Sequence, residues 1–357
     1  MRRAREGRGA VFMSGEKIAI VYGRVDASAP ADEKDVLVQV DAVRAALQRL
    51  GHPTIDVPVS LDLGVTAAVL KAAAPVIAFN LAETIDGKGS LIHLTPSLLG
   101  ALGIPYTGAP AEAIILTSHK LLGKKCLAGA GISTPPWTTA EGARNGGLTF
   151  PPPWIVKSIW EHASIGMEDS SVAGSREELS MELDRRAARE GIDNLFVEGF
   201  IDGREFNLAL VSGLDGPENL PPAEIEFVDY PDGKPRMVGY RAKWDEGSFE
   251  FSGTPRRFDF PRTDAPLIKE LVGLSRECWR LFELRGYARV DFRVDASGRP
   301  WILEVNTNPC LSPDAGFMAA AARAGLTLED VVKRIVGEAA AGSARTRTRK
   351  GGQERHA

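Results

Sequence analysis

Two carboxylates and an amide occupy alternate positions in a predicted β-hairpin near the C-terminus. The first strand contains Asp291, and the second contains Glu304 with Asn306 two residues further on. Side chains of a strand alternate between its two faces, so a turn at 295–298 places Asp291 roughly opposite Glu304. Arg289 lies on the same face of the first strand. Oxygen ligands of these types suit Mg²⁺. Carboxylates this close would repel each other without a cation between them, so the hairpin predicts a metal site.

The hairpin alone also fits a simpler interpretation, in which the acids lie on a solvent-facing strand and pair with Arg289 and Arg293. Three lysines favour a ligand site instead. Lys157 ends an apolar strand, a common way to direct a cation at a ligand, while Lys120 begins a helical stretch and Lys243 precedes a tryptophan. Each lysine alone is more often solvent-exposed than functional. The lysines and the metal face together predict a nucleoside triphosphate site without a P-loop.

The composition is that of an ordinary globular protein, with 357 residues of which 44% are hydrophobic and 25% charged. It excludes a disordered protein, because disorder needs low hydrophobicity and high net charge. The length exceeds what one hydrophobic core usually supports, so we expect two or three domains. The net charge of -4 provides no basic excess for binding phosphate backbones, so no nucleic-acid partner is expected.

The three cysteines, Cys126, Cys278 and Cys310, show no paired spacing, which disfavours zinc and fits a reducing compartment. No apolar run approaches the ~18 residues of a membrane span. The basic stretch that begins at Met1 lacks the apolar core of a signal peptide. We therefore predict a cytoplasmic protein with no membrane contact, for which Met13 is an alternative start.

The order of apolar segments predicts an α/β fold whose first part is a parallel sheet. Strands are expected at 17–23, 54–59 and 75–81, with a helix between the first two. The GxGxxG turn of a dinucleotide-binding sheet is missing after the first strand. The sequence therefore favours a strand–helix–strand unit that does not bind a dinucleotide.

Two further units follow this first one. The expected helices are 111–116, 120–130, 176–190 and 267–281, and the expected strands are 154–157, 195–201, 205–211, 223–228, 238–242 and the hairpin. Thr327 and Asp330 form a capping box for a last helix to about Glu338. Residues 343–357 are rich in Gly, Arg, Thr and Lys and are expected to form a disordered basic tail.

Beyond these patterns, the chain resembles the ATP-grasp superfamily, and most closely its D-alanine–D-alanine ligase branch. The resemblance runs from about Lys17 to Gly337. It rests on these motifs: Phe79-Asn80-Leu81, Gly103-Ile104-Pro105-Tyr106-Thr107-Gly108, Ile155-Val156-Lys157, Ser164-Ile165-Gly166, Val197-Glu198-Gly199-Phe200-Ile201 with Glu205, Ala288-Arg289-Val290-Asp291, and Glu304-Val305-Asn306-Thr307-Asn308-Pro309.

The resemblance implies an α/β (α+β) ATP-grasp fold with three domains. The N-terminal domain would be a Rossmann-like parallel sheet at 14–108. Two ATP-grasp subdomains would follow, a central one at 109–198 and a C-terminal one at 199–342, and the nucleotide would be held between them. The tail at 343–357 would lie outside the fold. Family members are often dimers, so the resemblance also implies a homodimer.

The resemblance implies a nucleotide role for each matching residue. Lys120, Lys157 and Lys243 would contact the ATP phosphates, and the loop that contains Ser164 and Gly166 would close over them. The remaining roles fall on residues of the later motifs: Glu198, Gly199 and Ile201 for adenine, Glu205 for the ribose, and Asp291, Glu304 and Asn306 for two Mg²⁺ ions, with Mn²⁺ as an alternative.

The implied reaction joins a carboxylate to an amine. ATP converts the carboxylate into an acyl phosphate, the amine attacks the acyl carbon, and ADP and phosphate are released. Arg289 and the backbone N–H of Cys310 would stabilise the oxyanion. Ser164 and Lys243 would assist catalysis from the phosphate side. Because ATP already activates the carboxylate, Cys310 is interpreted as a structural residue in preference to a nucleophile.

The sequence departs from the family where the amino acids should bind. The glutamate that holds the first substrate corresponds to Glu33 in a poorly matching segment, and the loop serine is replaced by Ala163. Trp244 stands where a tyrosine is usual, and an indole donates a hydrogen bond but cannot accept one. After Pro309 the segment contains Ser312 and an acidic residue, Asp314, which would repel a carboxylate and favour an amine.

These observations predict an ATP-dependent carboxylate–amine ligase whose substrates, expected to be amino acids, differ from D-alanine. Three alternatives remain: a genuine D-alanine–D-alanine ligase, another ATP-grasp activity, and a nucleotide-binding module without turnover. Retention of the metal residues and all the lysines argues against the last of these.

Overall fold

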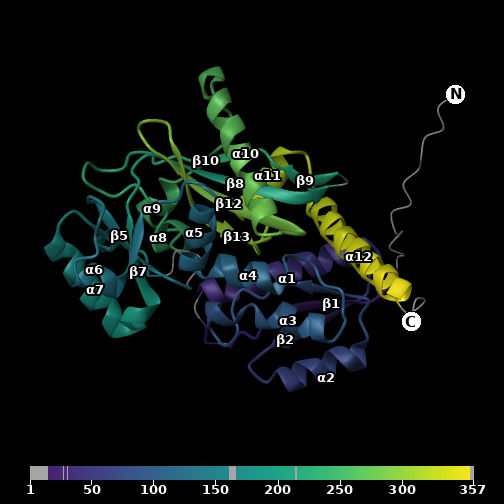
Figure 1. The fold of residues 1–357 in the computed structure, drawn as a ribbon. Coiled ribbons are helices and arrows are strands. Elements are labelled where there is room, and N and C mark those ends of the chain that lie inside the picture. The colour runs from purple at the N-terminus through teal and green to yellow at the C-terminus, as the bar shows by residue number, and fades with distance from the viewer. Residues whose placement is uncertain (1–14, 27, 30, 161–165, 214, 354–357) are drawn as a thin grey trace.

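The computed structural model describes residues 15–26, 28–29, 31–160, 166–213 and 215–353. Three β-sheets, surrounded by helices, follow one another along this part of the chain (Figure 1). The first has three parallel strands in the order β2–β1–β3. They are β1 (Ile18–Gly23), β2 (Thr54–Val59) and β3 (Ile77–Asn80). The predicted parallel sheet is therefore confirmed.

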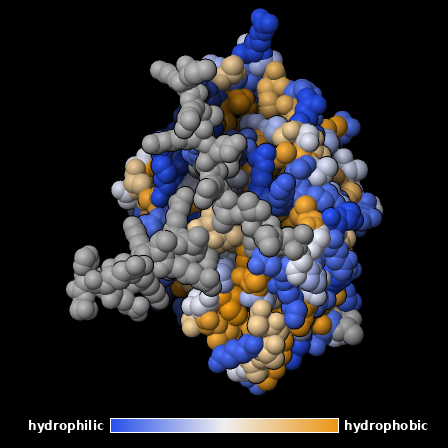
Figure 2. Space-filling view, turned by 90° about the vertical axis from the view of Figure 1, so that its right-hand side faces the viewer, coloured by the Kyte–Doolittle hydropathy of each residue, from blue (hydrophilic) through white to orange (hydrophobic). Residues whose placement is uncertain are grey.

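Helices cover both faces of this first sheet, which explains why its strands are continuously apolar. The connections contain α1 (Ala31–Arg49), α2 (Leu63–Ala73), a 3₁₀ turn at Gly89–Leu91 and α3 (Leu94–Ala101). Exposed apolar side chains lie on or just before α2, at Leu61, Val65 and Val69. Figure 2 shows hydrophobic surface gathered low on the molecule, at the height where Figure 1 shows α2.

The second sheet has four antiparallel strands in the order β4–β7–β5–β6. They are β4 (Trp137–Thr139), β5 (Trp154–Ser158), β6 (Val172–Ala173) and β7 (Leu195–Gly199). Two helices cover it, α6 (Ala140–Arg144) and α7 (Arg176–Glu190), and 3₁₀ turns lie at Asp169–Ser171 and Ile192–Asn194. A capping box begins α7, because Ser175 and Glu178 each bind the other's backbone N–H.

The third sheet has six strands, with β11–β10–β8–β12–β13 in order and β9 also paired to β8. They are β8 (Arg204–Gly213), β9 (Gly216–Asn219), β10 (Ala223–Ile225), β11 (Arg256–Arg257), β12 (Tyr287–Val294) and β13 (Pro300–Asn306). The accompanying helices are α8 (Tyr240–Trp244), α9 (Phe249–Ser252), a 3₁₀ turn at Arg262–Asp264, α10 (Ala265–Leu281), α11 (Gly316–Arg323) and α12 (Leu328–Gln353).

The hydrophobic cores do not follow the order of the chain. Helices α4 (Ala111–Ser118) and α5 (Lys120–Gly129) precede the second sheet but pack on the third, where Ile114 and Leu127 join a core with Phe206. Helix α12 packs against the first sheet, beside α1 in Figure 1. The first sheet lies within 14–108 and the third within 199–342, whereas β7 of the second sheet ends one residue past 198, and the core packing also crosses the predicted ranges.

Two local predictions are wrong. The segment 238–242 was expected to be a strand, but residues Tyr240–Trp244 form α8, and the Ser248 hydroxyl donates to the Arg241 carbonyl at its end. A five-residue apolar alternation does not separate a strand from one helical turn. The last helix was expected to end near Glu338, but the backbone of α12 continues to Gln353, because alanine, arginine and lysine favour a helix.

Residues 354–357 of the expected tail lie outside the described part of the chain. Among the helices that are described, none has both the length and the apolar character to cross a bilayer.

Candidate active site

The pairing of β12 with β13 brings the predicted metal residues together. Asp291 pairs with Glu304, and Arg289 pairs with Asn306. The register shifts immediately after Asp291, which is a bulge-like irregularity in the ladder. The predicted cross-strand arrangement of Asp291 and Glu304 is therefore confirmed.

Arg289 holds Asp291 with two hydrogen bonds. The guanidinium Nε and Nη2 donate to the two carboxylate oxygens at 2.7 and 2.8 Å, and Asn207 donates to Oδ1 at 2.8 Å. Burial opposes the charge on Arg289, but the adjacent Asp291 carboxylate outweighs it and raises the pKa of the guanidinium. Arg289 is therefore a fixed positive charge directly beside the acidic pair.

The donor set on this face suits a hard divalent cation. In the described part of the chain, no three His, Cys, Asp or Glu side chains converge on one point. The available ligands are instead the carboxylates of Asp291 and Glu304 with the amide oxygen of Asn306, which already accepts from the Asn308 N–H at 3.0 Å. Carboxylate and amide oxygens are ligands that Mg²⁺ and Mn²⁺ prefer. The residues present therefore fit the predicted metal.

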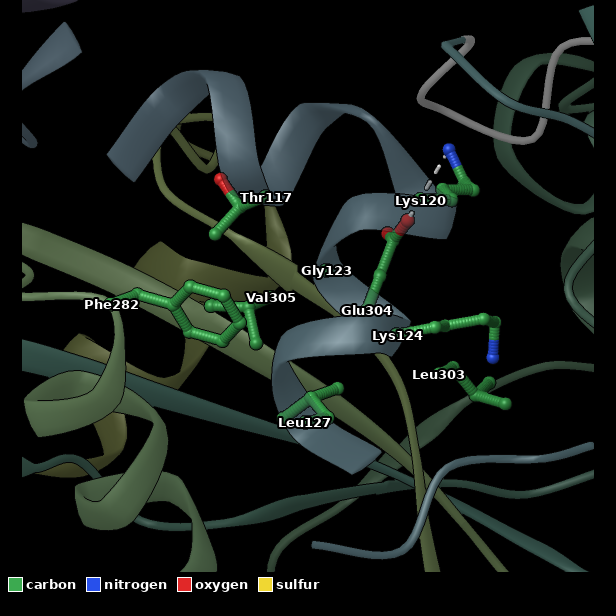
Figure 3. Close-up of a pocket in the computed structure, with 9 residues that line it drawn as sticks. All are labelled: Thr117, Lys120, Gly123, Lys124, Leu127, Phe282, Leu303, Glu304 and Val305. Carbon is green, nitrogen blue, oxygen red and sulfur yellow. Dashed lines mark ion pairs between the residues drawn. The ribbon is translucent and has the colours of Figure 1, made fainter. Parts of the chain in front are cut away.

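Lys120 faces this acidic pair across a small pocket. Its Nζ lies 3.8 Å from Glu304 Oε2, and Figure 3 shows the two side chains pointing toward each other. The amino group of Lys124, from the next turn of α5, points away from Glu304 in the same view. The pocket is lined by Thr117, Lys120, Gly123, Lys124, Leu127, Phe282, Leu303, Glu304 and Val305.

Glu198 and two lysines form a buried charge cluster at the junction of the second and third sheets. Lys157 Nζ donates to Glu198 Oε1 at 2.7 Å, and Lys124 Nζ lies 2.5 Å from Oε2. Burial opposes the charge on Glu198, but the two ammonium groups outweigh it and lower the pKa of the carboxyl. Burial lowers the pKa of Lys124 to about 8.

The same cluster is tied to β13 through a threonine. Lys124 Nζ donates to Thr134 Oγ1 at 2.7 Å, and the Thr134 hydroxyl donates to the Ile302 carbonyl at 2.8 Å. The carboxylate expected at the adenine is therefore linked to the strand that contains Glu304 by one ion pair and two hydrogen bonds.

Glu205, expected at the ribose, pairs with Arg293 on the neighbouring strand at 2.8 Å. Arg293 also donates to the carbonyls of Gly203 and Arg236, and it lies over the rings of Phe200 and Phe227. Burial raises the pKa of Glu205. This arginine therefore fixes the position of the glutamate and of the segment around 236.

Lys243 lies in α8 and faces the acidic pair. Burial and the charge of Arg289 lower the pKa of its amino group, while Glu304, Asp291 and Glu205 act in the opposite direction. Of the other predicted nucleotide residues, Gly199 ends β7, Ile201 follows it, and Gly166 has a left-handed φ of 70°. Ser164 and Ala163 lie outside the described residues, in the gap at 161–165.

Asp35, in α1, contacts the segment that follows the hairpin. Its two carboxylate oxygens accept hydrogen bonds from the Cys310 thiol and the Ser312 hydroxyl, both at 3.1 Å. The Ser312 N–H donates to the Cys310 sulfur at 3.3 Å. Glu33, the predicted residue, lies two positions earlier and so about 200° around the helix. It lies near the loop at Gly87, so the residue that reaches 310–312 is Asp35.

Comparison with known proteins identifies the family. Residues 135–337 match the protein-family model described as "D-ala D-ala ligase C-terminus". A D-alanine–D-alanine ligase of Moorella thermoacetica is 30% identical over 335 residues, which cover 90% of this chain and 98% of the relative. The chain belongs to the D-alanine–D-alanine ligase family. It is an ATP-dependent, ADP-forming carbon–nitrogen ligase that resembles D-alanine–D-alanine ligase, as predicted.

Other relatives of this ligase extend the comparison. An uncharacterized protein of Sinorhizobium fredii is 28% identical over 301 residues, 83% of this chain and 85% of that protein. The D-alanine–D-alanine ligase of Bacillus anthracis, solved in complex with ATP, has a TM-score of 0.69 at 21% identity and covers 94% of this chain and 100% of its own. D-alanyl-alanine synthetase A of Vibrio cholerae has a TM-score of 0.70 at 17% identity, covering 92% and 99%. The predicted ATP-grasp fold is therefore confirmed.

Sequence reasoning missed Lys124 in this ligase, although one signal pointed to it. Lys124 follows Lys120 by four residues, so both side chains lie on one side of α5. Lys125 is next to it in the sequence and is exposed, whereas the Lys124 side chain is 2% exposed. Helical periodicity separates the two lysines, but residue type does not.

Two acidic residues close to the 310–312 segment were also missed. Asp35 and Glu83 come from α1 and from the loop after β3, and Gln39 links that loop to the 310–312 segment. A polar side chain that follows a buried parallel strand lies at the sheet edge where ligands often bind, which was the available signal for Glu83.

Trp244 is partly buried at the end of α8.

Proposed function

We propose that this ligase activates an amino-acid carboxylate with ATP and joins it to an amine, and that its substrate pair is not two D-alanines. The observation that carries the activation step is the β12–β13 register, which sets Asp291 against Glu304 and Arg289 against Asn306. Lys120 and Lys243 face the same acids. Such a face supports the transfer of a phosphoryl group, because its charge is positioned before the ligand arrives.

The nucleotide is proposed to lie between the second and third sheets. The lysines Lys120, Lys157 and Lys243 would bind its phosphates, and the loop with Ser164 and Gly166 would cover them. Glu198, Gly199 and Ile201 would hold the adenine, and Glu205 the ribose. The ion pairs of Glu198 and Glu205 support these roles, because they hold both carboxylates in fixed positions.

Asp291, Glu304 and Asn306 would hold two Mg²⁺ ions, or Mn²⁺. When bound, the metal neutralises the charge that develops on the transferring phosphoryl group. Both carboxylate oxygens of Asp291 accept hydrogen bonds from Arg289, so a bound metal would have to share these oxygens with the guanidinium. The pairing of β12 with β13 thus holds Asp291 and Glu304 close together, and the positive charge of Arg289 limits the repulsion between the two carboxylates.

Arg289 is proposed to act in the second step, where the amine attacks the acyl carbon. The carbonyl oxygen then gains negative charge, and a fixed guanidinium can stabilise it. The backbone N–H of Cys310 would be the second donor. The bidentate contact with Asp291 supports this role, because it orients Arg289 before the reaction.

The amino-acid side supports a substrate other than D-alanine. Asp35 already accepts from Cys310 and Ser312, and Trp244 lacks the acceptor of the usual tyrosine. D-alanine–D-alanine ligation remains the second candidate, because relatives such as that of Moorella thermoacetica carry this name. The proposed homodimer and cytoplasmic location are to be tested by light scattering and cell fractionation.

The test is ADP release by the purified ligase with Mg-ATP, using L-amino acids, D-alanine, D-serine and β-alanine singly and in pairs. We expect little release with D-alanine alone and stimulation by another carboxylate and amine. Formation of D-alanyl-D-alanine as the fastest reaction would overturn the substrate proposal. An ATP-dependent thermal shift without turnover on any pair would contradict the ligase reaction itself.

A further inference from the structure

Glu83 is a partly buried carboxylate to which the proposed mechanism gives no role. It lies in the loop that follows β3, and its Oε1 accepts a hydrogen bond of 2.6 Å from Gln39 Nε2. Gln39 is itself 1% exposed, and its Oε1 accepts from the Leu311 N–H at 3.0 Å. One buried amide therefore holds both Glu83 and the residue next to Cys310.

A second link fixes the same two segments. Asn308 Nδ2 donates to the carbonyl of Ala82 at 3.0 Å, and Asn308 Oδ1 accepts from the Tyr287 hydroxyl at 2.6 Å. The backbone before Glu83 is thus bound to the chain that leads from β13 to Cys310. Since the N–H of Cys310 is proposed to bind the oxyanion, Glu83 lies beside the position where the acyl carbon would be attacked.

Among the described residues, no lysine, arginine or histidine forms an ion pair with Glu83. The groups that face it are Asp35 from α1, Arg289 from β12 and Lys243 from α8. Two further titratable groups, Tyr287 and Cys310, also sense its charge. A partly exposed carboxylate beside a second acid is a suitable contact for a substrate ammonium group.

Burial raises the pKa of Glu83 to about 7, although the Gln39 hydrogen bond opposes the shift. A general base works best when its pKa lies near the operating pH. The proposed reaction needs such a base, because an amino-acid amine is an ammonium ion at neutral pH and cannot attack a carbonyl until it loses a proton.

We infer that Glu83 is the general base that takes a proton from the ammonium group of the second substrate. The inference rests on the proposed function. Glu83 accepts one proton, and the free amine lone pair forms the new C–N bond. The bond between the acyl carbon and the phosphate oxygen breaks, and the departing phosphate takes the second N–H proton. Glu83 then returns its proton to solvent.

The experiment compares two amines in the wild type and in Glu83→Gln, which keeps the size of the side chain. One amine is the amino acid that best stimulates ADP release in the panel above. The other is hydroxylamine, which is neutral at pH 7 and captures acyl phosphates as hydroxamates without a base. Asp86→Asn is the matched control, because Asp86 is an exposed carboxylate on the same loop.

We expect Glu83→Gln to form the amide about 10²-fold or more slowly at neutral pH and to form the hydroxamate at the wild-type rate. In the wild type, kcat/KM for the amino-acid amine should rise with pH and level off above about 7, whereas in Glu83→Gln it should keep rising above pH 7 with the fraction of free amine. Asp86→Asn should match the wild type with both amines.

Equal losses of amide and hydroxamate in Glu83→Gln would overturn the base role and indicate a structural one. Wild-type rates with both amines would overturn it as well. A wild type that forms neither hydroxamate nor amide with any carboxylate of the panel would instead contradict the proposed function, and the base role with it.

Discussion

The proposed nucleotide side and the proposed amino-acid side of the site differ in how their acids are compensated. On the nucleotide side, each buried acid has a cation: Glu198 has Lys157 and Lys124, Glu205 has Arg293, and Asp291 has Arg289. On the amino-acid side, Asp35 accepts from a thiol and a hydroxyl, and Glu83 accepts from an amide.

This difference separates a preformed site from one that lacks a counter-charge. Paired charges hold side chains in place and keep the positions of ligand groups fixed. Acids that bind only neutral donors keep their negative charge available for a cationic part of the substrate. The proposed nucleotide side therefore has acids that are compensated before a ligand binds, and the proposed amino-acid side has acids that a cationic group of a substrate could compensate.

The strongest test of the paired region is Lys124→Met. Removing one partner of a buried ion pair leaves the other uncompensated, so the free energy of unfolding should fall by about 3 kcal/mol. Urea unfolding measures this loss. Lys125→Met is the control, because Lys125 is exposed on the same helix. An equal change in the two variants would mean that Lys157 alone compensates Glu198.

Arg289→Ala tests whether the pair with Asp291 serves catalysis. Loss of an oxyanion donor should lower kcat by about 10²–10³-fold, while the ATP-dependent rise in Tm remains. Arg289→Lys keeps the charge but not the two-pronged contact, so it should recover only part of the rate. Unchanged steady-state turnover in Arg289→Ala would contradict the assigned role.

On the amino-acid side, the uncompensated carboxylate of Glu83 should make the free energy of unfolding depend on pH. The pKa of Glu83 is about 7 in the folded protein against 4.5 in the unfolded chain, so the folded state binds more protons between these values. Stability should therefore decrease as pH rises through this range, by about 1–2 kcal/mol after allowance for partial exposure. Glu83→Gln should lose this slope in urea titrations. A wild-type slope equal to that of the variant would contradict a raised pKa.

Ser312→Ala should have the smallest effect. It removes one hydrogen bond from a hydroxyl to the Asp35 carboxylate, which is worth about 1.5 kcal/mol. The KM for the amino-acid substrate should change while the KM for ATP stays the same, because Ser312 lies on the amino-acid side only. Ser180→Ala, at an exposed position of α7, is the control. A change in the KM for ATP alone would show that the two sides are not separate.

Local patterns predicted the parts of the ligase that depend on neighbours in the sequence. The hairpin register followed from strand alternation across a short turn, and it correctly set Asp291 against Glu304. The bounds of α7 followed from its charged helical segment, and a capping box begins it. In both cases the interacting residues lie within about one turn or one hairpin of each other.

Contacts between distant segments could not be predicted in the same way. Asp35 reaches Ser312 across 277 positions, and nothing in the sequence of α1 prefers it to Glu33. Lys124 is buried because α5 packs at a junction of two sheets, a position that its neighbours in the sequence do not define. The contacts of Asp35 and the burial of Lys124 could be recognised only from the tertiary structure.

The packing of α12 has a consequence for co-translational folding. The strands of the first sheet can pair once residue 80 has been made, but one apolar face of that sheet is covered by Val331, Val332 and Ile335, near the other end of the chain. One apolar face of the nascent N-terminal unit therefore stays exposed until α12 has been synthesised, and chaperones can bind this face in the meantime. A fragment cut at the first domain boundary should aggregate, and translation should finish before this unit becomes protease-resistant.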